Sequence, residues 1–300
     1  MRAIIVQRPG QPGSFGLENV PDPRPGAGQV RIRMAGSAIN PADLHVMDGL
    51  GGTPHPPGRW GVGLDVSGVI DMVASDVREL SIGTPVAALT FPHAPHSAAG
   101  AAAEYVIVPA ADVAPVPERV DLLDAATVPL NSLTADQLLA RLGPADGRRL
   151  LVTGAAGGVG GYAVALAALA GWSVTGLART SDAEFLGRAG ADEVITSLEG
   201  ASAYDAVLDA AKLGGAALRA VRDHGMYAGV FPGLEPAGER GIMITSGVVA
   251  PDGRRLREIL ALTAQGRLET RRAGVQPLEK AALAYQAFRE GGRGRWVLTP

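Results

Sequence analysis

The pattern of apolar and polar positions changes near Leu122, and the change predicts two kinds of structure in one chain. Before Leu122, short apolar stretches are separated by glycine and proline and show no helical period. Such spacing is typical of short strands in an antiparallel barrel or sandwich. The strands predicted there span residues 2–7, 29–35, 68–72, 85–88 and 104–108.

After Leu122, strand-like stretches alternate with helix-like ones, which predicts a doubly wound parallel sheet. The clearest helix, over 254–264, places Leu256, Ile259 and Leu260 on one face and follows Asp252. The other predicted helices span 162–170, 182–189 and 215–222, and the strands 150–153, 173–178, 193–195, 204–209, 225–230 and 241–245. A helix over 278–289 and a strand over 295–299 close the chain, and we expect these last residues to return to the first domain.

A glycine-rich turn at 154–161 joins the strand at 150–153 to the helix that follows it. Backbone N–H groups in such a turn, together with the dipole of the helix, can hold a pyrophosphate. Glycine allows the backbone to approach the phosphates closely, and the next strand completes the βαβ unit that this motif requires. The residues predicted to bind the cofactor here are Gly154, Ala155, Gly157, Gly158, Val159 and Gly160.

This glycine-rich segment admits two other interpretations. It could be a tight strand–helix junction of the kind found in any α/β protein, and the motif alone leaves that alternative open. No charged residue occurs between Arg149 and Arg179, which raises the alternative of a membrane span. The glycines divide the segment into pieces well short of the roughly 20 apolar residues that a span needs. We therefore reject the membrane span.

Composition narrows the classes of function. A 300-residue chain with 47% hydrophobic and 19% charged residues is typical of a globular protein. A net charge of −3 argues against a general binder of nucleic acids or of anionic membranes. The absence of cysteine excludes disulfides, a thiol nucleophile and cysteine-based zinc sites. The first residues contain too short an apolar run for a signal peptide, so a cytoplasmic location is expected.

The residues after the strand at 173–178 bear on the choice of cofactor. NAD-binding units of this type place an acidic residue at the end of this strand, where it binds the ribose 2′-OH. Here Arg179 and Thr180 stand instead, and a guanidinium group suits a 2′-phosphate. NADPH is therefore favoured over NADH. In the alternative interpretation, Ser181 and Glu184 form a capping box that starts the next helix, and Arg179 is a surface residue; both can hold together.

Two histidines could belong to a metal site. His93 and His96 are three residues apart, but their loop has no carboxylate before Glu104. Two histidines alone make a poor metal site, so no bound metal is expected.

Ordered segments along the whole chain resemble the medium-chain dehydrogenase/reductase superfamily, in its zinc-free quinone oxidoreductase branch. One departure is Thr84-Pro85, where that family usually has aspartate after the glycine, and the chain is also short for the family. The matching segments are A-I-N-P-A-D at 38–43, G-L-D-V-S-G-V-I at 63–70, A-E-Y at 103–105, V-P-L-N-S-L-T-A at 128–135, Y-D-A-V-L-D at 204–209, P-D-G at 251–253 and G-R-W-V-L at 294–298.

The resemblance implies a Rossmann doubly wound parallel sheet plus a GroES-like β-barrel domain. The barrel domain would span 1–121 and 271–300, the Rossmann domain 122–270, with the active site in the cleft. The implied activity is zinc-independent hydride transfer from NADPH to a quinone or an α,β-unsaturated carbonyl compound, a small apolar conjugated substrate. An enoyl or tailoring reductase of a polyketide-like pathway, and an NADPH-binding protein without turnover, remain alternatives. The resemblance also implies a homodimer that pairs the strand at 241–245 across a two-fold axis.

Without a metal, hydrogen-bond donors must receive the charge that develops on a carbonyl oxygen. The Asn40 amide can donate, and Asp43 could orient a neighbour or a water. His45 can donate a proton near neutral pH, with a half-buried helix histidine as the equal alternative. Asp65 is interpreted chiefly as a turn-forming residue.

The remaining predicted cofactor contacts come from the resemblance and from strand ends. Asn131 and Thr134 occupy positions where the family approaches the nicotinamide ribose and the phosphates, with helix capping as the alternative. Further contacts are predicted at the carboxyl ends of two strands, where such sheets bind ligands; a core role for Phe231 is equally open. These residues are Val230, Phe231, Ser246, Gly247 and Val248.

Overall fold

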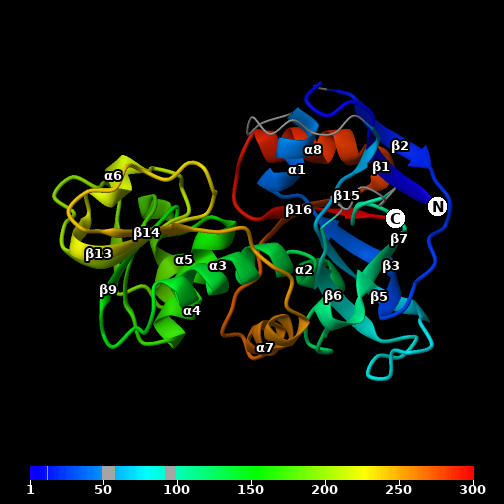
Figure 1. Cartoon of the computed structure of the whole chain (residues 1–300), viewed down its shortest axis with the longest axis horizontal. Helices are drawn as coiled ribbons and strands as arrows, with labels where there is room; N and C mark the ends of the chain where they lie inside the picture. Colours follow the sequence, from blue (N-terminus) through cyan, green and yellow to red (C-terminus); the bar gives the residue numbers. More distant parts are fainter. Residues whose placement is uncertain (12, 49–57, 92–98) are drawn as a thin grey trace. The chain divides into compact units, whose positions relative to one another are not determined.

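A computed structural model describes residues 1–11, 13–48, 58–91 and 99–300 (Figure 1). These residues form two compact units. The first comprises Met1–Leu130, Pro251–Gln265 and Thr270–Pro300, and the second Asn131–Ala250 and Gly266–Glu269. The domain limits expected from the resemblance stay a prediction.

The first unit is built from mostly antiparallel strands. Strand β1 (Arg2–Val6) pairs with β2 (Phe15–Asn19) and β4 (Trp60–Gly61). A larger sheet has the order β15 (Arg272–Pro277), β16 (Arg295–Thr299), β3 (Gln29–Ala38), β5 (Asp65–Val73), β6 (Pro85–Leu89) and β8 (Val113–Pro115), with β7 (Tyr105–Pro109) also on β3. Strand β16 pairs antiparallel with β3, so the strand formed by residues 295–299 belongs to this unit.

Apolar side chains on alternate positions of the strands form the core of the first unit. Val30, Ile32 and Met34 of β3 are buried, and the residues between them are not. Side chains alternate between the two faces of a strand, so this pattern turns one face inward.

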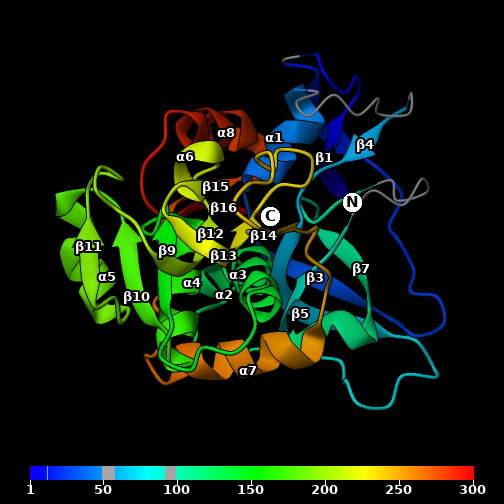
Figure 2. The same cartoon turned by 60° about the vertical axis from the view of Figure 1, so that its left-hand side comes forward.

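Helices complete the first unit. Helix α1 (Pro41–Asp48) lies beside α8 (Ala281–Arg289) in both views (Figure 1 and Figure 2). An ion pair between Arg289 and Asp48 joins the two helices. Helix α7 (Gly253–Ala264) begins as predicted, because the Asp252 side chain accepts a hydrogen bond from the Arg255 N–H at 2.8 Å. The short helices are α2 (Leu122–Ala125), η1 (Ala110–Asp112) and η3 (Leu278–Lys280).

The second unit has a six-stranded sheet in which every pair is parallel. Its strand order is β11 (Glu193–Ile195), β10 (Ser173–Leu177), β9 (Arg149–Thr153), β12 (Tyr204–Asp209), β13 (Val221–Gly229) and β14 (Met243–Ser246). In the order of the chain this is 3-2-1-4-5-6, the arrangement of dinucleotide-binding folds. The helices are α3 (Pro129–Arg141), α4 (Gly158–Leu169), α5 (Ala183–Arg188), α6 (Gly215–Leu218) and η2 (Thr180–Asp182). The predicted doubly wound sheet is confirmed.

Some sequence predictions of secondary structure were wrong. The helix expected over 215–222 is the single turn α6, because Val221 already pairs with Tyr204 as the start of β13. Helix α1 and strands β2 and β15 were not predicted. No helix in the described ranges has the length and apolarity that crossing a membrane would require.

Candidate functional site

The glycine turn, residues 154–160, connects β9 to α4 in the second unit. Gly154 has φ +58°, a backbone conformation that residues with a Cβ rarely adopt. A Cβ on Gly160 would lie 2.2 Å from the Gly154 carbonyl oxygen, so Gly160 lets the helix pack against the turn. Gly157 is the N-cap residue of α4 and is exposed. Among the described residues, the one atom close to a Cβ built on Gly157 would be the Gly154 carbonyl oxygen, at 3.0 Å.

The turn has the properties of a phosphate cradle. The first N–H groups of a helix have no partner within the helix and favour an anion. In α4 these groups belong to Gly158, Val159 and Gly160, next to the exposed Gly157. Ala155, also in the turn, is fully buried. The residues present therefore fit the pyrophosphate of a dinucleotide.

Arg179 and Thr180 follow β10, and both are exposed. Among the described residues, no carboxylate forms an ion pair with Arg179. The predicted capping box is wrong: α5 begins at Ala183, its N-cap Asp182 makes no capping bond through its side chain, and Ser181 lies within η2. The chain tightens into a one-turn 3-10 helix before α5, which leaves Arg179 and Thr180 at the end of the strand.

Asp209, the last residue of β12, anchors the loop that follows it. Its buried carboxylate accepts hydrogen bonds from the Tyr227 hydroxyl at 2.7 Å, the Gly214 N–H at 2.8 Å, the Leu213 N–H at 3.1 Å and the Thr153 hydroxyl. Burial and the bond to Asp209 raise the pKa of Tyr227. The sequence prediction gave Asp209 no role, although an acidic residue that ends a buried strand before Gly214-Gly215 was a usable signal.

Phe231 and Val230 follow β13 and are half-buried. The Lys212 ammonium lies over the Phe231 ring, 4.9 Å from its centroid. This contact places the aromatic side chain at the carboxyl end of the sheet, where ligands bind in such folds.

Helix α3 fixes the segment after β14. The Gln137 side chain donates to the Ala250 carbonyl at 2.7 Å and accepts from the Ala250 N–H at 2.9 Å, and Arg141 donates to the Ser246 carbonyl. Thr134, Gly247 and Val248 line one small hollow beside this helix. The predicted residues Thr134, Gly247 and Val248 are thus neighbours.

Asn131 and Thr134 both lie inside helix α3 and are at least nine-tenths buried. The helix already begins at Pro129, so neither of them, nor Ser132, is the N-cap residue. The capping alternative is therefore wrong for these positions.

Asn40 and Asp43 stabilise the start of α1 in the first unit. The Asp43 carboxylate accepts from the Asn40 N–H at 2.8 Å and from the Gly63 N–H at 2.9 Å. An N-cap asparagine, proline at the first helical position and an acid two residues later are a helix-start signal. Sequence reasoning had this signal in N-P-A-D but interpreted Asn40 and Asp43 only chemically.

Asp65 completes this group, and Asn40, Asp43 and Asp65 are named here the buried carboxylate cluster. Asp65 is fully buried and accepts from the Asn40 amide at 2.8 Å and from the Leu130 N–H at 2.7 Å. The second Asn40 amide hydrogen goes to the Ala38 carbonyl at 3.2 Å. Asp65 is thus more than a turn-forming residue, because within the first unit it joins the start of β5 to Asn40 and to Leu130. Asn40 has no exposed surface, and its side-chain amide donates its hydrogen bonds to groups in the protein interior.

Burial raises the pKa of both carboxyl groups in this cluster. The pKa of Asp43 and that of Asp65 each rise to about 7, because the low-dielectric interior disfavours the charged form. The charge of Asp43 raises the pKa of Asp65 further, while their hydrogen bonds and Arg295 oppose the rise. His45 lies on the same helix, two residues beyond Asp43, and is half-buried.

The predicted histidine pair cannot be placed. His93 and His96 lie outside the described residues. Within the described parts of the chain, no three metal-ligating side chains of His, Asp or Glu come together.

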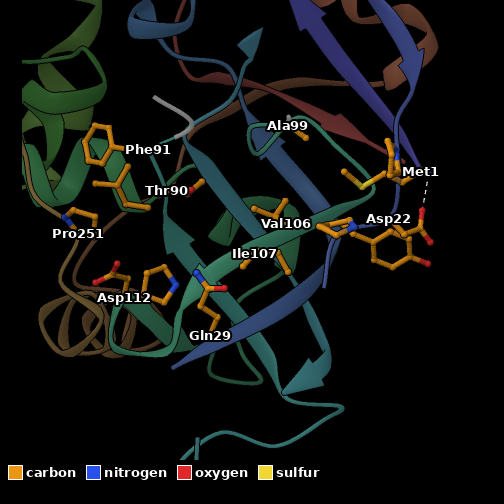
Figure 3. Close-up of a pocket in the computed structure, with 15 residues that line it drawn as sticks. Met1, Asp22, Gln29, Thr90, Phe91, Ala99, Val106, Ile107, Asp112 and Pro251 are labelled. Atoms are coloured by element: carbon orange, nitrogen blue, oxygen red, sulfur yellow. Dashed lines mark hydrogen bonds and ion pairs between the residues drawn. The ribbon is translucent and has the colours of Figure 1, made fainter. Parts of the chain in front are cut away.

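A cavity of about 660 Å³ runs along β7 in the first unit (Figure 3). Thr90, Phe91 and Pro251 lie at one end, and the ion pair between the Met1 ammonium and Asp22 lies at the other. Its walls are mainly apolar, and no residue of the buried carboxylate cluster lines it.

Comparisons with known proteins point to one family. The family model of the alcohol dehydrogenase GroES-like domain matches residues 26–118. The chloroplast envelope quinone oxidoreductase homolog of Arabidopsis thaliana is 33% identical over 66% of this chain and 65% of that protein. The NADPH-dependent alkenal/one oxidoreductase of the same plant is 31% identical over 74% of this chain and 60% of that protein. The chain thus spans less than two thirds of these two relatives.

Other matches cover all of this chain and nearly all of the related protein. The quinone-oxidoreductase QR1 of Triphysaria versicolor is 28% identical over 100% of this chain and 98% of that protein. The structure of the quinone oxidoreductase from Coxiella burnetii has a TM-score of 0.86 at 24% identity, with 100% and 99% coverage. An NAD-dependent alcohol dehydrogenase has a TM-score of 0.85 at 28% identity, with full coverage of both chains. Together with the matched domain, these structures confirm the predicted fold class, a Rossmann sheet plus a GroES-like domain.

Proposed function

We propose that this chain, which belongs to the medium-chain dehydrogenase/reductase superfamily and to its quinone oxidoreductase-like branch, is a nicotinamide-dependent oxidoreductase. The observation that carries the proposal is the glycine turn of β9 and α4 within a parallel sheet of order 3-2-1-4-5-6. In open α/β sheets, ligands bind at the carboxyl ends of the strands where the strand order reverses. Here that point lies between β9 and β12.

NADPH is the proposed cofactor, and when bound it supplies the hydride. The exposed Arg179 and Thr180 after β10 would hold its 2′-phosphate, and no acidic residue stands there to bind a free 2′-OH. The name of the NADPH-dependent relative supports the same choice. Gly157, Gly158 and Val159 would hold the pyrophosphate. Asn131, Thr134, Val230, Phe231 and the segment 246–248 are the proposed contacts of the nicotinamide half.

A quinone or an α,β-unsaturated carbonyl compound is the proposed hydride acceptor. The names of the relatives, which include quinone and alkenal/one oxidoreductases, support an apolar conjugated substrate. We also propose that transfer needs no zinc, because the chain has no cysteine ligand and resembles the zinc-free branch. A homodimer is proposed on the same resemblance.

His45 is the proposed proton donor, with water as the alternative. Asn40 and Asp43 would act as positioning residues, because their hydrogen bonds fix the first turn of the helix that carries His45. The substitution His45→Gln removes the titrating group. We expect it to lower kcat by about 100-fold and to leave the Kd for NADPH unchanged.

The proposal is tested by following NADPH oxidation with a panel of quinones, enals, enones and enoyl thioesters, with and without a metal chelator. Turnover of a quinone, enal or enone that the chelator leaves unchanged supports the proposal. Turnover confined to enoyl thioesters identifies the enoyl reductase instead. Tight NADPH binding without turnover of any compound would identify a binding protein and overturn the assignment as an enzyme.

A further inference from the structure

The loop after β12, residues 210–214, is held by buried polar groups and is named here the lysine loop. The Leu213 and Gly214 N–H groups donate to Asp209, and the Ala211 N–H donates to the Thr153 hydroxyl at 3.0 Å. Asp209 and Thr153 are almost completely buried. Three of the five backbone N–H groups of the loop are therefore tied to the ends of two adjacent strands.

Lys212 stands at the centre of this loop in an uncommon backbone conformation. Its φ is +59°, a value that residues other than glycine adopt rarely and that surrounding bonds must hold in place. The ammonium lies over the Phe231 ring, 4.9 Å from the centroid. In the part of the chain that the structure describes, no carboxylate forms an ion pair with it. A cation is thus held on an aromatic face without a neutralising anion.

The lysine loop borders the glycine turn. A Cβ built on Gly154 would lie 3.2 Å from the Cβ of Ala211 and 3.3 Å from its nitrogen. The loop leaves β12 and the turn leaves β9, the two strands between which the strand order reverses. Lys212 therefore stands beside the phosphate cradle, on the side of β12 to β14.

We propose that Lys212 binds the nicotinamide-side phosphate of the dinucleotide, and that Asp209 is the positioning residue that holds its loop. The inference rests on the proposed function. Arg179 follows β10 and would hold the 2′-phosphate of the adenosine half on that side of the glycine turn. The other half of the dinucleotide must then lie over β12 to β14, where Lys212 supplies a cation that no other described residue neutralises.

The test compares two probes by calorimetric titration: NADPH, and adenosine 2′,5′-bisphosphate, which lacks the nicotinamide half. We expect Lys212→Ala to raise the Kd for NADPH about tenfold and to leave the Kd for the bisphosphate unchanged. Arg179→Ala should weaken both. Lys280→Ala, which changes the one other lysine of the chain, is the matched control and should change neither. An unchanged Kd for NADPH in Lys212→Ala, or equal losses for both probes, would overturn the inference.

The role of Asp209 is tested by a double-mutant cycle. Asp209→Asn should raise the Kd for NADPH in the wild-type background and have little further effect in Lys212→Ala, because both changes remove the same contact. Additive losses would show that Asp209 affects NADPH binding independently of Lys212, and would overturn its role as the positioning residue. If the wild-type protein binds neither NADPH nor NADH, the proposed function fails; if it binds NADPH and Lys212→Ala binds equally well, only this inference fails.

Discussion

The buried carboxylate cluster of the first unit and the glycine turn of the second differ in where their hydrogen-bonding groups point. Asp43 and Asp65 accept hydrogen bonds from backbone N–H groups and from the Asn40 amide, and neither they nor Asn40 is exposed beyond 1%. The glycine turn, by contrast, has its N-cap Gly157 exposed, and the cations Arg179 and Lys212 near the same sheet edge are exposed as well. A polar motif can therefore maintain the fold or present groups to a ligand, and burial distinguishes the two.

The largest expected effect tests the first half of this comparison. Asp65→Ala removes the acceptor of the Asn40 amide and of the Leu130 N–H and leaves both donors buried without it. We expect the free energy of unfolding to fall by about 3 kcal/mol. Urea unfolding measures this loss. Glu118→Ala, which removes an exposed carboxylate of the same unit, should stay within about 0.5 kcal/mol of wild type; an equal loss in both variants would contradict the structural role.

The substitution Gly157→Val tests the second half of this comparison, the role of the glycine turn in binding phosphate. The backbone of Gly157 is extended, with φ −80°, so valine fits its conformation but places a side chain where the phosphate would lie. We expect the Kd for NADPH to rise by at least about 100-fold, or about 2.7 kcal/mol, with the melting temperature almost unchanged. Titration and thermal unfolding of the same sample separate the two effects. Unchanged affinity would falsify the phosphate-binding role of the turn.

The raised pKa of Asp65 sets the sign of a pH effect on stability. An unfolded aspartate has a pKa near 3.9, and in the folded protein the value is about 7. Between these values the folded state holds a proton that the unfolded state has lost, so the unfolding free energy falls as pH rises through this window. We expect wild type to lose stability relative to Asp65→Asn between pH 5 and 7, by at most about 1.4 kcal/mol per pH unit. Urea unfolding at several pH values gives this difference, and a constant difference would contradict the raised pKa.

The smallest effect concerns cofactor selectivity. We expect wild type to bind NADPH about tenfold more tightly than NADH, and Arg179→Ala to abolish most of this difference, about 1.4 kcal/mol. Titration with both cofactors measures the ratio. If the ratio is the same in wild type and variant, Arg179 does not bind the 2′-phosphate.

The fold was predictable where periodicity and glycine spacing are strong. Helix α7 follows from its apolar face and from Asp252, and β9 and α4 follow from the apolar strand before the glycine turn. The site was harder to predict, because the role of a polar residue depends on contacts distant in sequence. Asp65 resembles a turn residue until its bond to Leu130, 65 residues away, is seen. Lys212 owes its position to Asp209, and hence to Thr153 and Tyr227 on neighbouring strands.

The pairing of β16 with β3 has a consequence for how the chain folds as it is synthesised. Strand β3 pairs with residues 295–299, so the sheet of the first unit cannot be complete until these residues have been synthesised. The second unit begins later in the chain, but the last of the six strands in its sheet ends at residue 246. The parallel sheet of the second unit can therefore form on the ribosome before the larger sheet of the first unit is complete.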